Sequence, residues 1–186
     1  MPLVLRNERD AWRVGLNHRR YGEEESEQPR QRIFNLIRKS EVSRYVCGEA
    51  DPALFDREEF QRALESSLEE GGHFHLLFHN ASSKARALDN LAGRPRKVLL
   101  KAKVQWPARV RMYHVNERPG RHFATFDNVV MREEEHQPHA NRACEFLESA
   151  DVAQYASRVF EQKLEKEGCS EVTEEEAKAA LERNGR

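Results

Sequence analysis

The sequence predicts an α/β domain, a mixed sheet with helices on both faces in a layered sandwich. Short apolar runs such as RYVCG and HFHLLF have the length of buried strands. Between such runs, apolar residues recur every three or four positions, which is typical of amphipathic helices. This alternation of strands and helices favours a mixed sheet covered on both sides. A chain of 186 residues suits one such domain with a modest extension.

The first 28 residues (1–28) are predicted to be an N-terminal extension and linker. Their last stretch, GEEESEQ, is charged and offers little apolar surface to bury. The domain itself is expected over residues 29–168. Its first helix should start at Pro29, because proline is favoured in a first helical turn, with Ile33 and Phe34 on its buried face.

The next predicted elements are a strand, a helix and a second strand. Residues 44–48 indicate a short buried strand that ends at a glycine turn. Asp56 is expected to cap a helix whose apolar residues recur every fourth position from Phe60 to Leu68. A glycine pair ends this helix, and residues 73–80 form the following strand.

A third helix is expected to start at a cap on Ser82 or Ser83 and to end at Gly93. Two strands should follow it, over Lys97–Val104 and Arg109–Val115.

The remaining predicted elements of the domain are three strands and a helix. Strands are expected over residues 122–126, 129–132 and 144–147, and a helix is expected from Asp151. Residues 169–186 are predicted to be a Glu-rich helical tail outside the domain. Thr173 and Glu176 form a capping-box pattern there. The tail has little apolar surface, so we expect it to fray.

Composition and cysteine usage point to a soluble cytoplasmic protein with no membrane contact. The formal net charge is −1, which gives no overall attraction to nucleic acid or membrane. The cysteines Cys47, Cys144 and Cys169 are far apart and lack metal-binding spacing, so we expect reduced thiols. No segment has the run of about 18 apolar residues that a membrane span requires. The N-terminus lacks the pattern of a secretory signal.

Basic residues concentrate between Lys84 and Arg111. This segment contains nine of them and a single acid, Asp89. Such a segment could form a surface for nucleic acid or another polyanion. Aromatic residues are sparse in it, so stacking on single strands is weakly supported. The alternative is a solvated face whose aliphatic stems cover the sheet. The nine basic residues are Lys84, Arg86, Arg94, Arg96, Lys97, Lys101, Lys103, Arg109 and Arg111, and all of them except Arg94 are candidate binding residues.

Four segments in order, RYVCGEADPALFD, HFHLLF, VRMYHVNERPGRHFATFD and ADVAQYASRVFEQKL, resemble a single domain of the phospholipase D superfamily. The resemblance covers roughly residues 42–167 and is to a degenerate bacterial branch. It implies the sandwich fold of that superfamily. Because two copies of the family signature must meet in one site, it also implies a homodimer.

The same resemblance locates the family signature, a histidine, a lysine two residues later and an aspartate five beyond that. His122 matches the histidine, whereas Ala124 and Val129 stand at the lysine and aspartate positions. Asp127 comes two residues too early, and an extended strand would hold it about 17 Å from the histidine, at ~3.3 Å per residue.

Catalysis by this signature requires a cation that the chain lacks. Losing one preorganised charge typically costs about 10²–10³ in rate. Unless Arg121 or Arg132 supplies another cation, no positive charge holds the phosphate oxygens during phosphoryl transfer. No catalytic residue is therefore firmly assigned, and the candidates are His122, Asp127, Arg121 and Arg132.

The leading hypothesis is a pseudoenzyme, a non-catalytic phospholipase D-like domain that serves as a dimerising interaction or ligand-binding module. Its partner is expected to be a second copy or another protein, and a phosphorylated ligand or nucleic acid could occupy the remnant cleft. One alternative is a phosphodiesterase or nuclease with a site rebuilt around His122. Another is an accessory protein that binds nucleic acid or polyanions.

Several histidines and glutamates are possible metal ligands. The cleft candidates Glu133, Glu135, His136 and His139 could supply oxygen and nitrogen ligands to zinc. Pro138 breaks the helical spacing of the pair, however, and no third ligand is fixed, so we expect no metal and no cofactor. Three further histidines share one face of the predicted strand over residues 73–80, and we expect their rings to pack partly buried on the sheet: His73, His75 and His79.

Overall fold

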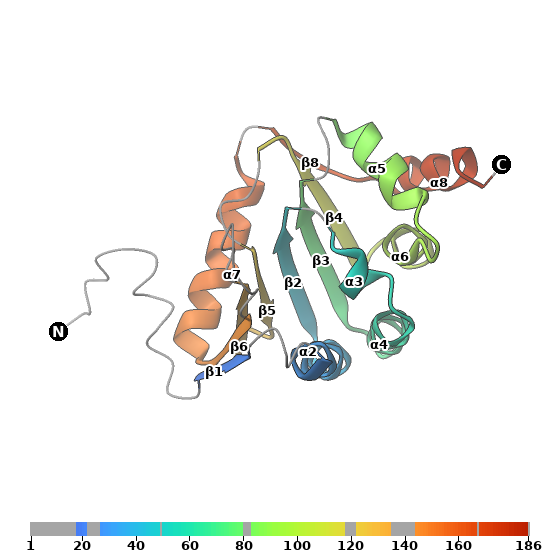
Figure 1. The fold of residues 1–186 in the computed structure, drawn as a ribbon. Helices are drawn as coiled ribbons and strands as arrows, with labels where there is room; N and C mark the ends of the chain where they lie inside the picture. The colour runs from blue at the N-terminus through green and yellow to red at the C-terminus, as the bar shows by residue number, and fades with distance from the viewer. Residues whose placement is uncertain are drawn as a thin grey trace.

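A computed structural model gives the fold (Figure 1). It describes residues 18–21, 27–48, 50–79, 83–117, 122–134, 144–166 and 168–185. An eight-stranded sheet in the order β1-β7-β6-β5-β2-β3-β4-β8 runs through the molecule. The strands are β1 (His18–Tyr21), β2 (Val42–Cys47), β3 (His73–Phe78), β4 (Val110–Val115), β5 (His122–Phe126), β6 (Val130–Glu134), β7 (Cys144–Glu148) and β8 (Cys169–Glu171).

The sheet is mixed, as the sequence predicts. Strands β2, β3 and β4 are parallel neighbours, whereas β5, β6, β7, β1 and β8 pair antiparallel. The parallel strands are joined through helices, because a parallel connection must cross from one end of the sheet to the other. The helices are α2 (Glu27–Lys39), α3 (Pro52–Phe55), α4 (Glu58–Glu69), α5 (Lys84–Ala92), α6 (Val98–Gln105), α7 (Ala150–Leu164) and α8 (Glu174–Arg183).

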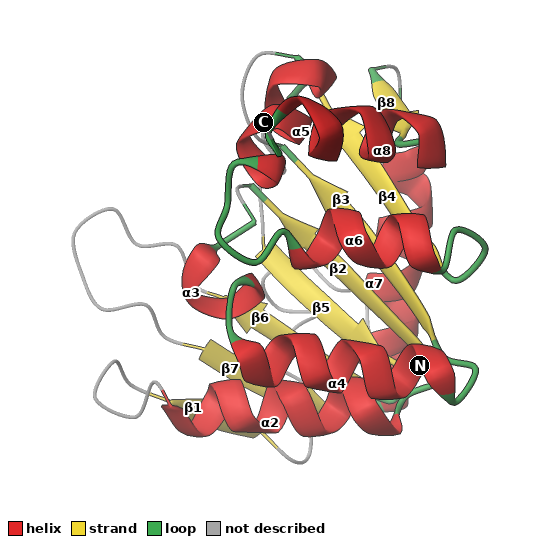
Figure 2. Ribbon diagram, turned by 90° about the vertical axis from the view of Figure 1, so that its right-hand side faces the viewer, coloured by secondary structure: helices red, strands yellow, loops and turns green. Residues whose placement is uncertain are grey.

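Helices cover both faces of the sheet, but unequally. Figure 2 shows α2, α3, α4, α5, α6 and α8 on one face, with α7 behind the sheet. The larger core lies under the many-helix face and contains Phe34, Phe60 and Phe74. The smaller core lies under α7, where Phe123 of β5 packs with Phe160 of α7. Burial of such aromatic side chains supplies about 1.5–3 kcal/mol each.

Helix α4 confirms the predicted apolar face but corrects its start. Arg57 is the N-cap, and Asp56 instead ends the short helix α3. The true side-chain cap in this region is Asp51, whose carboxylate accepts from the amide of Ala53 at 2.9 Å. Gly71 follows α4 with φ +102°, a left-handed conformation that favours glycine.

The predicted strand Lys97–Val104 is wrong, because this segment is helix α6. Leu100, Ala102 and Val104 alternate with lysines, which suggested a strand. Leucine, lysine and alanine are strong helix formers, however, and Val98 and Leu99 share a buried helical face with Ala102. The segment is helical because both faces of the parallel strands must be covered by helices.

The C-terminal segment packs onto the domain, whereas the sequence predicts residues 169–186 to be a tail outside it. Strand β8 pairs antiparallel with β4 at the sheet edge. Helix α8 carries the predicted capping box between Thr173 and Glu176. Ala177 and Ala180 are fully buried, so the expectation of a fraying helix is wrong. Small side chains let this helix approach α5 and α6 closely, and a narrow apolar face is then enough.

Among the described residues, none of the helices has the length and apolarity to cross a membrane. Cys47 is buried and Cys169 is half-buried, and neither forms a disulfide with a described residue. Cys144 starts β7, and its side chain lies outside what the structure describes.

Candidate ligand-binding site

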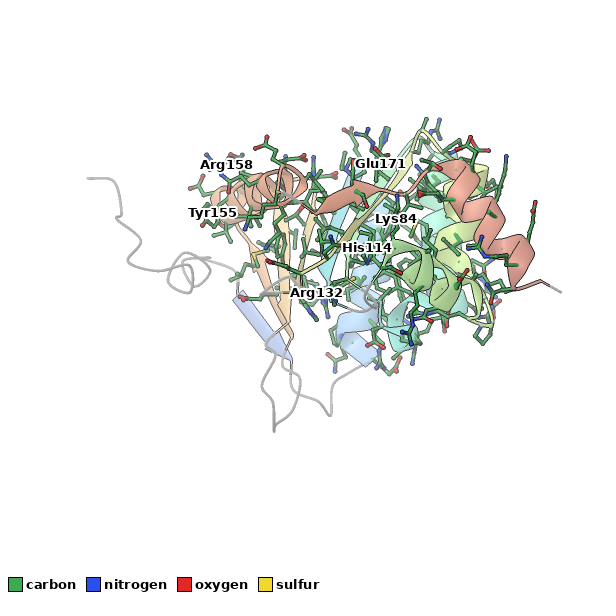
Figure 3. The ribbon with its side chains drawn as sticks, turned by 90° about the horizontal axis from the view of Figure 1, so that it is seen from above. Lys84, His114, Arg132, Tyr155, Arg158 and Glu171 are labelled. Carbon is green, nitrogen blue, oxygen red and sulfur yellow. The ribbon has the colours of Figure 1, made fainter. Side chains whose placement is uncertain are left out.

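His122 is the first residue of β5 and lies at the carboxyl ends of the parallel strands. The register pairs Val46, the penultimate residue of β2, with Phe123, so His122 stands beside the end of β2. Ligands in open α/β sheets bind outside the carboxyl ends of the strands. Figure 3 looks onto this end of the sheet, with His114 and Arg132 labelled.

The imidazole of His122 is held by the main chain. The amide of Gly48 donates a hydrogen bond of 2.9 Å to Nε2. This contact assigns the proton of the neutral ring to Nδ1, because Nε2 must act as the acceptor. Gly48 is needed for the approach, since an added Cβ would lie 2.9 Å from Nε2. The sequence showed Gly48 only as a turn residue.

Ala124 lies on the same side of β5 as His122, because strand residues two apart share a face. It is fully buried in the larger core and pairs with Tyr45 of β2. Its cross-strand partner on β6 is Arg132, which is half-buried. Directly opposite residues have Cβ atoms about 4.5–5.5 Å apart. The register thus places Arg132 on the same face as Ala124, the residue that the resemblance aligns with the signature lysine.

Asp127 does not belong to this site. It lies beyond the opposite end of β5, where it and Asn128 form a tight turn with φ +52° and +55°. Aspartate and asparagine tolerate this left-handed conformation better than most residues. The carboxylate accepts from the amide of Val42 at 2.8 Å, so it ties the turn to β2. Val129, at the family's aspartate position, is the exposed end of the same turn.

The remaining cleft candidates are not gathered around His122. Glu133 pairs with Phe123, whose side chain packs in the core under α7, so Glu133 belongs to the other face of the sheet. Four further candidates lie outside the described residues: Arg121, Glu135, His136 and His139.

Two histidines from neighbouring strands share the same end of the sheet. The rings of His79 and His114 lie parallel, with centroids 6.4 Å apart and an interplanar angle of 15°. The amide of His79 also donates to the carbonyl of Gly48 at 2.8 Å. His114 is not among the sequence-predicted site residues, because nothing in its strand pattern marks it. Within the described part of the chain, no group of three potential ligands could hold a metal ion.

Several of the predicted polyanion-binding residues serve the fold itself. Lys103 is only 4% exposed, and its Nζ donates to the carbonyls of Val110 and Pro107 at 3.0 and 3.3 Å. Arg109 donates to the carbonyl of Leu68 at the end of α4. These two cations therefore point into the packing of the domain.

Other members of the basic set contact acids or carbonyls on the surface. Lys84 lies 2.7 Å from Glu176, and Arg111 lies 3.5 Å from Glu171. The nine residues thus do not form one continuous cationic surface. The remaining contacts join Arg96 to Glu58 at 4.0 Å and Lys97 to the carbonyl of Asn184 at 3.2 Å.

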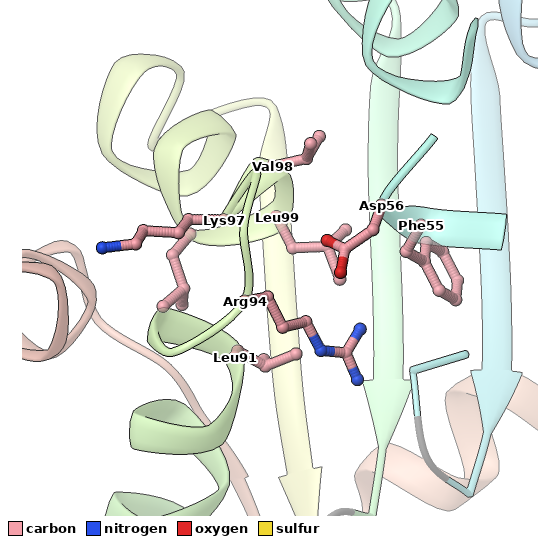
Figure 4. Close-up of a pocket in the computed structure, with 8 residues that line it drawn as sticks. Phe55, Asp56, Leu91, Arg94, Lys97, Val98 and Leu99 are labelled. Carbon is pink, nitrogen blue, oxygen red and sulfur yellow. The ribbon is translucent and has the colours of Figure 1, made fainter. Parts of the chain in front are cut away.

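A small pocket lies in the many-helix layer, between α3 and the start of α6 (Figure 4). Its walls include Phe55, Leu91 and Val98, and Figure 4 shows the guanidinium of Arg94 extending toward Asp56. The lining contains none of the residues around His122, so the pocket is a separate feature.

Comparison with known sequences gives no family assignment. No protein-family model matches the chain, and no curated protein matches it either.

Solved structures show the fold. The chain is similar to Nuc, a phospholipase D family member from Salmonella typhimurium, with a TM-score of 0.56 and 8% identity over 84% of this chain and 99% of that one. It is similar to phosphatidylserine synthase from Haemophilus influenzae, with a TM-score of 0.53 and 12% identity over 91% and 45%.

A third similar structure is TrmBL2, an archaeal chromatin protein with a novel mode of DNA binding. Its TM-score is 0.60 at 8% identity, over 86% of this chain and 56% of that one. The chain thus spans nearly all of Nuc but only about half of the synthase and of the archaeal protein. Identities this low concern the fold alone, and the chain has a phospholipase D-like α/β fold.

Proposed function

We propose that this chain is a non-catalytic phospholipase D-like domain that acts as a dimerising, ligand-binding module. The observation that carries the proposal is the bond from the Gly48 amide to Nε2 of His122. The lone pair that a nucleophilic imidazole would offer to phosphorus is already engaged by the main chain. An attack would first have to break this bond and move the ring away from β2.

Position 124, two residues after His122, also favours a non-catalytic domain. Ala124 is buried in the core and has no polar group to hold a phosphate. Removing one group that stabilises transition-state charge costs about 10²–10³ in rate. Asp127, the carboxylate nearest in sequence to the signature's aspartate position, is engaged with β2 at the far end of the strand. These features favour binding over turnover.

The test uses the full chain in two measurements. We expect no hydrolysis of bis(p-nitrophenyl) phosphate or of DNA, and elution as a dimer with a mass measured by light scattering. Turnover that disappears in His122→Ala would contradict the non-catalytic assignment. A monomer at all accessible concentrations would contradict the dimerising one.

A second candidate function is a phosphodiesterase with a rebuilt site, and the position of Arg132 favours it. This arginine is the direct partner of Ala124 on β6 and could replace the missing lysine. The prediction is then turnover that falls by about 10²-fold in Arg132→Gln and is lost in His122→Ala. Mass spectrometry of the protein after exposure to substrate would show a phosphate attached to His122. Arg38→Gln, at an exposed position of α2 outside every proposed site, is the control and should leave the rate unchanged.

A nucleic-acid-binding role is supported by two exposed cations, Arg86 of α5 and Lys101 of α6. If DNA binds there, reversing both charges should weaken binding and lower the salt dependence by about one phosphate contact per residue. Fluorescence anisotropy at several salt concentrations measures both effects. Binding that is insensitive to these changes would eliminate this surface.

A further inference from the structure

A row of basic side chains crosses three parallel strands on the face of the sheet that α7 covers. The register places Arg44 of β2 opposite His75 of β3, and His75 opposite Arg111 of β4. All three share a face with Val46, Leu77 and Tyr113, which pack under α7. Neighbouring strands are about 4.8 Å apart, so the two arginines flank His75 at roughly 10 Å from one another.

Arg44 is a largely buried cation with poor partners. Its side chain is 16% exposed, and Glu161 of α7 lies 3.4 Å from Nε. Nε nevertheless has no hydrogen-bond partner among the described residues, and Nη1 reaches the amide oxygen of Asn128 only at 3.4 Å. A guanidinium removed from water normally gains close, charge-assisted hydrogen bonds, which are about 2.7–2.9 Å long.

The row remains open to solvent at its other end. Arg111 is 51% exposed, and its Nε lies 3.5 Å from Glu171 of β8. His73 adds a further imidazole on the same strand face, with its ring centroid 6.3 Å from that of His75. Phe160 of α7 stacks on His75 and forms the wall of the row. Basic groups from three neighbouring strands therefore lie side by side next to one apolar wall.

We propose that this row binds a small tetrahedral oxyanion, such as a phosphate group, at the edge of the His75 ring between Arg44 and Arg111. Three donors from adjacent strands can each meet a different oxygen, whereas a carboxylate offers only two. Glu161 and Glu171 flank the row and would repel a long polyanion, which favours a compact ligand over a nucleic acid backbone. Ser157 and Asn128 close the row on the β5 side through their mutual hydrogen bond.

The proposal predicts a link between the bound anion and the protonation of His75. Burial, Arg44, Arg111 and His73 together lower the pKa of His75 to about 4. An anion would offset the repulsion from these cations, so binding should tighten as the pH falls. The charges around His75 are Arg44, Arg111 and His73 on the sheet, Glu161 on α7 and Glu171 on β8.

Sulfate is the probe, because it stays doubly charged from about pH 7.5 down to about pH 5 while histidines titrate. Titration of the full chain by NMR should move the ring signals of His75. Arg111→Gln should weaken sulfate binding about tenfold or more. Glu161→Gln should tighten it, because a competing carboxylate is removed from Arg44, and no loss of folding can mimic that gain. Affinity should also rise toward about pH 5.

The row lies on the opposite face of the sheet from Ala124 and Arg132, so its test is separate from that of the proposed function. Arg132→Gln should leave sulfate binding at His75 unchanged. Inorganic phosphate and a nucleoside monophosphate then distinguish a free anion from a phosphate ester as the ligand. Ring signals of His75 that do not respond to sulfate, or equal affinity in Arg111→Gln and Glu161→Gln, would overturn the proposal.

Discussion

Lys103→Met is expected to lower the free energy of unfolding by about 2–4 kcal/mol. The ammonium of Lys103 donates to the carbonyls of Val110 and Pro107, and Glu171 lies 3.8 Å away. Methionine keeps most of the aliphatic stem, so packing is largely preserved. The loss comes mainly from the buried carbonyl of Val110, which is left without this donor, and to a smaller extent from the part-buried carbonyl of Pro107 and the carboxylate of Glu171.

Urea unfolding followed by far-UV circular dichroism measures this loss. Lys101→Met is the matched control, because Lys101 lies one half-turn away on the same helix and is exposed. Its effect should stay within about 0.5 kcal/mol. Similar stabilities for the two variants would show that Lys103 does not hold α6 to β4.

The second large effect is a loss of stability in mild acid that depends on His75. Burial in the fold, followed by repulsion from Arg44, Arg111 and His73, lowers the pKa of His75 from 6.5 to about 4. The unfolded chain therefore binds a proton more readily between these values, so stability increases with pH in this window. The contribution is complete above about pH 6.5 and is lost as the pH falls toward about 4.

The expected loss from this residue is about 1–2 kcal/mol, reduced from the full linkage value because the ring is partly exposed to solvent. His75→Gln removes the titrating group and should flatten this part of the profile. Urea midpoints of both proteins between about pH 4 and about pH 7.5 give the comparison. Parallel profiles for the two proteins would assign the acid sensitivity to other groups.

The fold could be predicted where local pattern and burial agree. The strand His122–Phe126, the helix after Ser83 and the Thr173 capping box all carry signals within a few residues of each other. The sequence misled at Lys97–Val104, where the alternation of a strand and the composition of a helix compete. Only the demand for a layer over the parallel strands decides between them, and that demand is not local.

The candidate site depends on contacts that no short motif encodes. His122 and the missing lysine were visible in the sequence, but the amide of Gly48 on Nε2 joins residues from different strands. The same is true of the Arg44, His75 and Arg111 row, which exists only because three strands share one register. Asp127 is the opposite case, a residue that the sequence marks as a catalytic candidate but that the fold places in a turn away from the site.

The two-residue bend at Asp127 and Asn128 also determines which side chain can stand in for the absent lysine. It sets how far β6 is offset from β5, and so it makes Arg132 the neighbour of Ala124. A one-residue change in length there, if passed on to β6, would bring Met131 or Glu133 to that place and turn the arginine to the other side of the sheet. The charge available on the His122 side of β5 is thus set by the turn at the opposite end of the hairpin.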